Sequence, residues 1–200
     1  MPKMGKKTAP LVSAHWRLRK LILKDKILKL EHVTEVMNTL TSPHQRTTFS
    51  KLYGPICKSE RVAVEKVGRN NVGIVAKKKI KPGIRLQELP GKVSIRIPLK
   101  DEEKLKQCKK FPTYTSVVKR EQNSIEVYRY LIGPLAFANA ACTEHANVGT
   151  TTYSCLTTIL NPESEVIIEK QLFYYYGDEY PINEWCTICK KEKKIKNKLL

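Results

Sequence analysis

The division of the chain after Cys57 into short β-forming segments is the feature that most constrains its fold. These segments are rich in Val, Ile and Leu, and Gly, Asn and Pro separate them, so a meander of small strands is predicted. The expected strands cover 62–67, 72–77, 84–89, 93–97, 114–118, 166–168 and 172–176. Residues 99–111 are expected to form a helix or a loop, and the state of 124–131 is left open.

The N-terminal part has a different period. Apolar residues recur at steps of three and four over 16–40, which predicts one amphipathic helix. Ser42-Pro43 is typical of a helix start and Gly54-Pro55 of a helix end, so a second helix is expected between them. Residues 1–15 are predicted to be a flexible basic arm and 16–56 a helical subdomain. The predicted fold class is therefore α+β.

The charge of the chain is unusual. Its 37 basic and 19 acidic residues leave a net charge of +18, with a pI near 9.7. Residues 1–32 carry nine Lys or Arg against two acidic residues (+7), and residues 190–200 carry six Lys against one Glu (+5). The two ends are therefore predicted to contact a polyanion such as a DNA backbone, although many soluble proteins are equally basic.

Apolar segments and cysteines indicate the compartment. The longest apolar segment, 130–142, is interrupted by Gly133, Pro134 and Asn139 and is shorter than the roughly 18 residues that a membrane span requires. No apolar signal segment follows Met1–Lys7, so we expect an intracellular protein without a membrane partner. Six cysteines could pair as disulfides, but in a reducing compartment a CxxC pair more often binds a metal.

Two segments carry the most specific pattern. The first, Gly133–Cys142, is small and apolar and contains one Asn and one Cys, which permits close backbone approach. The second runs from Tyr174-Tyr175-Tyr176-Gly177-Asp178 to Glu184-Trp185-Cys186-Thr187-Ile188-Cys189. The pair resembles the G-P-x-x-F-x-N-H-x-C and Y-G-D motifs of SET-domain protein lysine methyltransferases, with their cysteine-rich post-SET tail. The match is closest to the branch that methylates lysine 20 of histone H4.

Other parts of the chain are similar to the same family. Residues 71–91 resemble its opening strand pair, 114–118 the strand beside the methyl-donor pocket, and the helices over 16–53 the N-terminal bundle of that branch. The resemblance implies a β-rich SET domain over 57–180 with a C-terminal pseudoknot, followed by a post-SET segment and basic tail over 181–200. It also implies a nuclear, chromosomal protein that binds a histone tail and the nucleosome.

The resemblance implies methyl transfer from S-adenosylmethionine to a lysine amine. Since free lysine has a pKa of about 10.4, the site must favour the neutral amine, and desolvation in a narrow channel does so. Positioning is then the main catalytic contribution. By motif position Tyr176 lines the channel, and Tyr175 and Phe137 shape its walls. The alternative for Tyr176 is an ordinary core aromatic residue of a strand.

Four further residues, with Phe137, are expected near the cofactor. Asn139 is predicted to hydrogen-bond to S-adenosylmethionine, against the alternative of an internally satisfied turn residue. Ala140 and Gly73 are placed there by motif position. Ser116 is a weaker candidate, because a plain strand serine is the preferred interpretation.

The post-SET resemblance implies a zinc site. Cys142, Cys186 and Cys189 are three candidate ligands, and tetrahedral zinc takes four. The related branch has a further cysteine where this chain has Glu184. Glu184 is named as the fourth ligand, with His145 or water as alternatives, and without a fourth ligand Cys186 and Cys189 would be a buried pair. Cys57, Cys108 and Cys155 show no partner pattern and are expected to be small apolar residues.

Two departures from the family pattern bear on activity. Ala140 replaces the histidine that follows the asparagine, and residues 143–146 make the next loop two residues longer than usual. An active enzyme and a catalytically impaired SET-fold chromatin-binding module therefore both remain open. A third possibility, a small zinc-bearing RNA-binding protein, rests on charge and the CxxC pair, and the strands lack the basic-aromatic motifs that would favour it.

Overall fold

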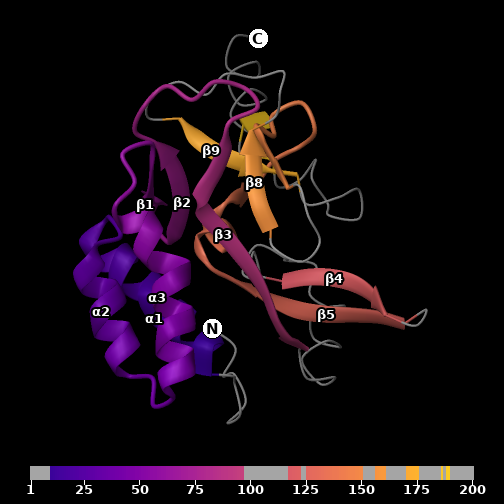
Figure 1. Cartoon of the computed structure of the whole chain (residues 1–200). Helices are drawn as coiled ribbons and strands as arrows, with labels where there is room; N and C mark the ends of the chain where they lie inside the picture. The colour runs from indigo at the N-terminus through magenta and orange to yellow at the C-terminus, as the bar shows by residue number, and fades with distance from the viewer. Residues whose placement is uncertain are drawn as a thin grey trace.

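The computed structural model of the chain describes residues 10–96, 117–122, 125–150, 156–160, 170–175, 186 and 188–189. Helices and short strands occupy separate parts of the sequence, which confirms the predicted α+β class. Figure 1 shows the helices grouped on one side of the molecule, beside β1 and β2, with β4 and β5 projecting on the other. The helices are α1 (Pro10–Asp25), α2 (Leu30–Asn38) and α3 (Pro43–Cys57).

The first helix begins earlier than predicted. Residues 10–15 were expected in a flexible arm, but α1 starts at Pro10 and buries Val12, Ala14 and His15. Leu18 and Ile22 continue the same face, so the buried stripe covers about three turns. A buried histidine interrupts the apolar pattern in the sequence, and its partner, Tyr53, lies 38 residues away.

The single helix expected over 16–40 is also wrong, because the chain breaks between α1 and α2. Lys26 has a φ of 71°. Ile27 pairs with Glu65 of β1, and the N–H of Leu28 donates to the carbonyl of Val64 at 2.8 Å. Hydrogen bonds to a strand far along the chain thus replace one helical turn, although the local apolar spacing continues without interruption.

The third helix begins at Pro43 after Ser42, as predicted. It does not stop at Gly54-Pro55 but continues to Cys57. Pro55 lies in the last turn, and Ile56, 3% exposed, packs into the core. Burial of this side chain favours the additional turn, even though a proline cannot donate a helical hydrogen bond.

The strands form one path of neighbours in the order β1-β2-β9-β7-β8-β3-β5-β4, and β6 also pairs with β9. Antiparallel pairing connects β1 to β2, β2 to β9, β7 to β8, β8 to β3, β3 to β5 and β5 to β4. Both β6 and β7 run parallel to β9. The bounds are β1 (Val62–Gly68), β2 (Asn71–Ala76), β3 (Arg85–Arg96), β4 (Val117–Gln122), β5 (Ile125–Ile132), β6 (Asn139–Ala140), β7 (Val148–Thr150), β8 (Leu156–Leu160) and β9 (Gln171–Tyr174).

Strand β3 corrects a prediction about the sheet. The Pro90-Gly91 pair was expected to separate two strands, but β3 runs through it. Up to Gly91, β3 pairs with β8, with a register shift between Leu86 and Gly91, and from Lys92 it pairs with β5. Proline and glycine here mark the point where the strand changes its partner, rather than a turn. Of the undecided segment 124–131, residues 125–131 lie in strand β5.

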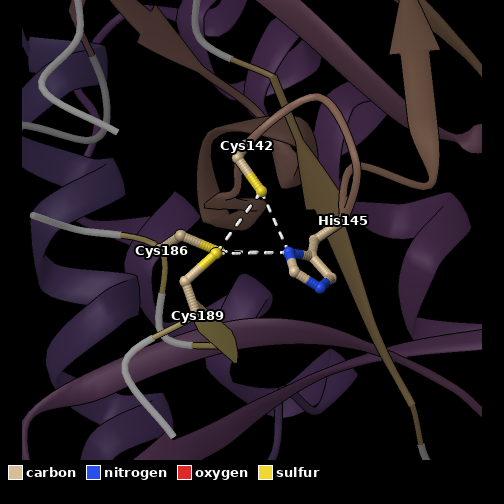
Figure 2. A group of neighbouring side chains, drawn as sticks. All are labelled: Cys142, His145, Cys186 and Cys189. Atoms are coloured by element: carbon tan, nitrogen blue, oxygen red, sulfur yellow. Dashed lines mark hydrogen bonds between the residues drawn. The ribbon is translucent and has the colours of Figure 1, made fainter. Parts of the chain in front are cut away.

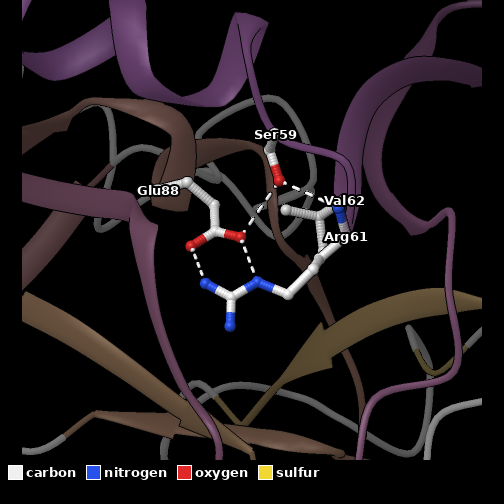
Figure 3. Close-up of polar contacts among 4 residues, drawn as sticks. All are labelled: Ser59, Arg61, Val62 and Glu88. Atoms are coloured by element: carbon white, nitrogen blue, oxygen red, sulfur yellow. Dashed lines mark hydrogen bonds and ion pairs between the residues drawn. The ribbon is translucent and has the colours of Figure 1, made fainter.

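A buried carboxylate fastens β3 to the start of β1. Glu88, 7% exposed, accepts hydrogen bonds from Arg61 Nε at 2.9 Å and Arg61 Nη2 at 2.7 Å (Figure 3). The hydroxyl of Ser59 donates to the same carboxylate at 3.0 Å and accepts from the N–H groups of Arg61 and Val62. The paired geometry satisfies a charge that would otherwise be costly to bury.

Candidate functional site

The segment of the first motif lies at the centre of the fold. Gly133 has a φ of 111°, and a Cβ there would meet the carbonyl oxygen of Pro90 at 2.4 Å, so only glycine fits. Pro134 then opens the short 3₁₀ helix η2 (Pro134–Phe137), and β6 follows. All residues from Leu131 to Asn139 are buried. The motif thus forms a tightly packed turn that leads into the sheet.

The helical subdomain holds this turn through two buried polar side chains. The N–H of Gly133 donates to the Tyr53 hydroxyl at 2.8 Å, and that hydroxyl also hydrogen-bonds to His15 Nδ1. The His15 ring stacks on Phe137, with centroids 4.7 Å apart. Burial, with a smaller contribution from Arg19, lowers the pKa of His15 to about 3, so the ring is neutral and Nδ1 can accept the hydroxyl proton.

The side chain of Asn139 ties three strands together. Its Nδ2 donates to the carbonyl of Val72 at 3.3 Å and to Gln171 Oε1 at 3.0 Å, and its Oδ1 accepts from Asn71 Nδ2 at 3.1 Å. Gly73 makes room for this amide, since a Cβ there would lie 2.8 Å from Asn139 Nδ2. The structure thus provides a packing reason for Gly73. Both N–H groups of the Asn139 amide are thus engaged, so donation to a cofactor would require one of these two bonds to open.

Strand β9 brings the second motif against the first. Tyr174 has Ala140 of β6 and Val148 of β7 as its two parallel neighbours, and the N–H of Ala141 donates to its carbonyl at 3.1 Å. The side chain of Asn147 donates to the carbonyl of Gln171 at 3.1 Å and accepts from the N–H of Phe173 at 2.7 Å. Residues 139–148 therefore wrap around β9.

The structure describes only some of the predicted site residues. Phe137 is 4% exposed and packs on His15, while Ala140 and Tyr175 are half-buried at the ends of β6 and β9. Ser116, Tyr176 and Glu184 lie outside the described residues, as do Cys108 and Cys155. The proposed channel and cofactor contacts stay predictions.

Three cysteines and one histidine form a cluster beyond β6. The donor atoms of Cys142, His145, Cys186 and Cys189 all lie within 4.8 Å of one another, with the sulfurs and the imidazole facing a common centre (Figure 2). His145 Nδ1 lies 2.9 Å from the sulfur of Cys142, 3.4 Å from that of Cys189 and 3.7 Å from that of Cys186. The sulfurs of Cys142 and Cys189 are 3.7 Å apart.

These separations approach the edges of a zinc tetrahedron. Zinc bonds of about 2.3 Å to sulfur and about 2.0–2.1 Å to nitrogen, at tetrahedral angles, give about 3.8 Å between sulfurs and about 3.6 Å between sulfur and nitrogen. Among these four separations, the contact of 2.9 Å between Cys142 and His145 is the one that would have to lengthen appreciably. The donor set and its geometry therefore fit a closed, structural zinc site.

Backbone groups around the cluster favour a thiolate. Burial opposes ionisation of Cys186, but N–H groups of Cys189, Cys142 and Ile188 outweigh it, and the pKa of this thiol falls to about 6. Burial and the neighbouring sulfurs raise the pKa of Cys189 to about 12. The thiol of Cys189 thus stays protonated beside Cys186, and a dication at the centre of the cluster would favour the thiolate form.

The longer loop before Asn147 is what delivers His145. The N–H groups of His145 and Ala146 both donate to the carbonyl of Cys142, at 3.1 and 2.8 Å, which folds the loop back over the sulfur. From the sequence, His145 is an alternative to Glu184 as the fourth ligand. The available signal was the three-residue spacing between Cys142 and His145, which lets one turn present both side chains.

The sequence matches no protein-family model and no curated protein. Several solved structures are similar in shape. The methyltransferase domain of human PR domain-containing protein 2 is 17% identical, with a TM-score of 0.40, over 76% of this chain and 90% of that chain. CpSET8 from Cryptosporidium is 12% identical, with a TM-score of 0.41, over 86% of this chain and 96% of that chain. At these values the likeness by itself decides neither family nor activity. None of the helices described is long and apolar enough to cross a bilayer.

Proposed function

We propose that the chain is a SET-domain protein lysine methyltransferase of the nucleus. It transfers a methyl group from S-adenosylmethionine to a histone lysine, and lysine 20 of histone H4 is the substrate to test first. The proposal rests on the resemblance of Gly133–Cys142 and Tyr174–Cys189 to the family motifs. Its alternative is a catalytically impaired SET-fold module that binds chromatin.

One observation supports the proposal most. The two motifs lie some forty residues apart in the sequence, yet β6 and β9 pair directly, and Cys142 meets Cys186 and Cys189 beyond them. Neither motif shows this association by itself. A chain that joins its motif segments in this way has the arrangement that the family resemblance requires.

The cluster of Cys142, His145, Cys186 and Cys189 also supports the proposal, because His145 can replace a ligand that the related branch has and this chain lacks. Glu184 stands where the related branch has a cysteine, which alone would leave a metal with three sulfur ligands. The extended loop supplies His145 instead, so the departure in the loop and the departure in the tail offset each other. We propose that Cys142, His145, Cys186 and Cys189 bind one structural zinc that fastens the chain end to β6.

The proposed chemistry needs little from acids or bases. S-adenosylmethionine, when bound, supplies an activated methyl group on its sulfonium. The chain has to exclude water, hold the lysine amine neutral and align it. Tyr176 and Tyr175 are the proposed channel residues, directly after β9. Backbone groups of Ala140, with Ser116, remain proposed cofactor contacts.

The enzyme proposal is tested with labelled donor and recombinant nucleosomes, followed by mass spectrometry of the histones. We expect label on histone H4, lost in nucleosomes carrying H4 Lys20→Arg and strongly reduced with the Tyr176→Phe variant. Titration of the folded protein with S-adenosylmethionine by calorimetry is the companion measurement. Absence of binding heat from a folded sample would favour the chromatin-binding module, and label on another lysine would correct the substrate.

The metal proposal is tested by zinc analysis of the purified protein. We expect about one zinc per chain, with loss of zinc in the Cys186→Ser and His145→Ala variants. Cys57→Ser and His44→Ala are matched controls, since both residues lie outside the cluster. Retention of zinc by His145→Ala would show that another group is the fourth ligand.

A further inference from the structure

The outward face of α1 is a continuous basic stripe. Arg17, Lys20 and Lys24 are all exposed and follow at steps of three and four residues, which places them on one side of the helix. Ser13 continues the stripe toward the N-terminus at the same spacing. The opposite side of α1 holds its buried residues, so this helix is held rigidly by the core and presents only polar and basic groups on this stripe.

The charges of this stripe meet few acidic groups among the described residues, and Asp25 beside Lys24 is one of them. Within the part of the chain that the structure describes, no ion pair involves Arg17, Lys20 or Lys24. The only acidic residue of α1, Asp25, is hydrogen-bonded to His32 at 2.8 Å. This distinguishes the stripe from another basic run of the chain, residues 77–81.

In that second run, the charges are partly compensated. Lys77 pairs with Glu65 at 2.7 Å, and Lys78 pairs with Glu60 at 2.6 Å. The stripe on α1 thus offers a polyanion three exposed cations on one face of a helix that the core holds in place.

We propose that the outward stripe of α1 docks the protein on the phosphate backbone of double-stranded DNA. From Arg17 to Lys24 the helix rises about 10 Å, at about 1.5 Å per residue. Three successive base pairs occupy a similar length of a duplex, about 3.4 Å each. Three long, flexible cations on a rigid helix therefore match a short run of phosphates along one strand.

The composition of the stripe disfavours other partners. A membrane-surface helix needs apolar side chains beside its basic ones, and this stripe has none. Single-stranded nucleic acid is bound on exposed aromatic platforms, which the stripe also lacks. Contacts to the phosphates of a duplex need neither apolar nor aromatic side chains. The choice of DNA rather than RNA rests on the proposed chromatin function, whereas the phosphate contact does not.

The experiment compares two variants of equal charge on the full chain. The first carries Arg17→Gln, Lys20→Gln and Lys24→Gln. The second carries Lys58→Gln, Lys81→Gln and Lys92→Gln, which are also exposed but lie outside α1. Binding to a labelled 25-base-pair DNA duplex is measured by fluorescence anisotropy over a series of salt concentrations, without histones or methyl donor.

We expect the α1 variant to lose about 10- to 100-fold in affinity at 100 mM salt, and its salt slope to fall by about 2 to 3. The control variant should retain its affinity within about 2-fold and its slope within about 1. Equal losses in both variants would overturn the proposal, because net charge alone would then explain binding. Equal midpoints of urea unfolding establish that both triple variants fold. If the α1 triple variant does not fold, the single variant Lys20→Glu takes its place.

Further probes separate the partners. Duplex RNA bound more tightly than DNA, with the same dependence on α1, would contradict the DNA assignment. A poly-glutamate peptide that competes as well as DNA at equal charge would overturn it in favour of an acidic protein surface. Because no methyl donor is present, either failure is distinct from failure of the proposed enzymatic activity.

Discussion

Removal of the Tyr53 hydroxyl tests how the helical subdomain holds the first motif. In Tyr53→Phe the ring stays, but the N–H of Gly133 loses its acceptor and His15 Nδ1 loses its hydroxyl partner. Both groups are buried, and an unsatisfied buried group costs about 1–3 kcal/mol. We therefore expect a loss of about 2–5 kcal/mol, a large part of the roughly 5–15 kcal/mol that a domain of this kind has.

Urea unfolding followed by circular dichroism measures this loss. With a slope of about 2 kcal/mol per molar, the midpoint should fall by about 1 M or more while the slope stays the same. A double-mutant cycle with His15→Leu locates the cause, because the double variant removes both partners of one hydrogen bond. The sum of the stability losses in the two single variants should exceed the loss in the double variant by about 1–3 kcal/mol. Additive losses, or an unchanged midpoint in Tyr53→Phe, would refute this account of the contact.

Three further predictions concern other buried contacts of the fold. The pKa of His15 lies near 3 in the folded chain and near 6.5 when unfolded, so the unfolded state takes up the proton first on acidification. The stability advantage of the wild type over His15→Gln should therefore shrink by about 2 kcal/mol between pH 7 and pH 5, as seen by unfolding at each pH; a constant difference would contradict a buried neutral ring. Gly73→Ala should cost about 1–3 kcal/mol by crowding Asn139, whereas Gly54→Ala, with nothing within 4 Å, should be neutral or stabilising in thermal melts. Arg61→Met should destabilise the fold by about 3 kcal/mol, more than Glu88→Gln does, because it leaves a buried carboxylate without its cation; the reverse order of melting temperatures would argue against this ion pair.

Local pattern predicted much of the secondary structure, and it failed where distant contacts intervene. The start of α3 and the positions of β1, β2 and β9 follow from capping residues and β-forming runs. The break at Lys26 could not be predicted, since Ile27 and Leu28 bond to a strand almost forty residues later. The continuity of β3 through Pro90-Gly91 depends likewise on two partner strands, β8 and β5.

The candidate site divides in the same way. The family resemblance grouped Cys142, Cys186 and Cys189 as candidate ligands and placed Asn139 and Gly73 near the cofactor. The tertiary structure placed His145 beside the three cysteines. It also showed that the amide of Asn139 in β6 hydrogen-bonds to residues of β2 and β9. It also joined Tyr53 and His15 to Gly133, which no motif indicated.

The sequence by itself therefore determined the α+β class, the motif segments and the basic character of the N-terminal part. These properties depend on residue type and on spacing along a few turns or strands. Only the tertiary structure decided the fourth member of the cysteine cluster, the partner change of β3 and the polar link between the helices and the first motif. Each of these joins residues far apart in the chain, and the free energy of a hydrogen bond or a buried contact depends on which groups the fold brings together.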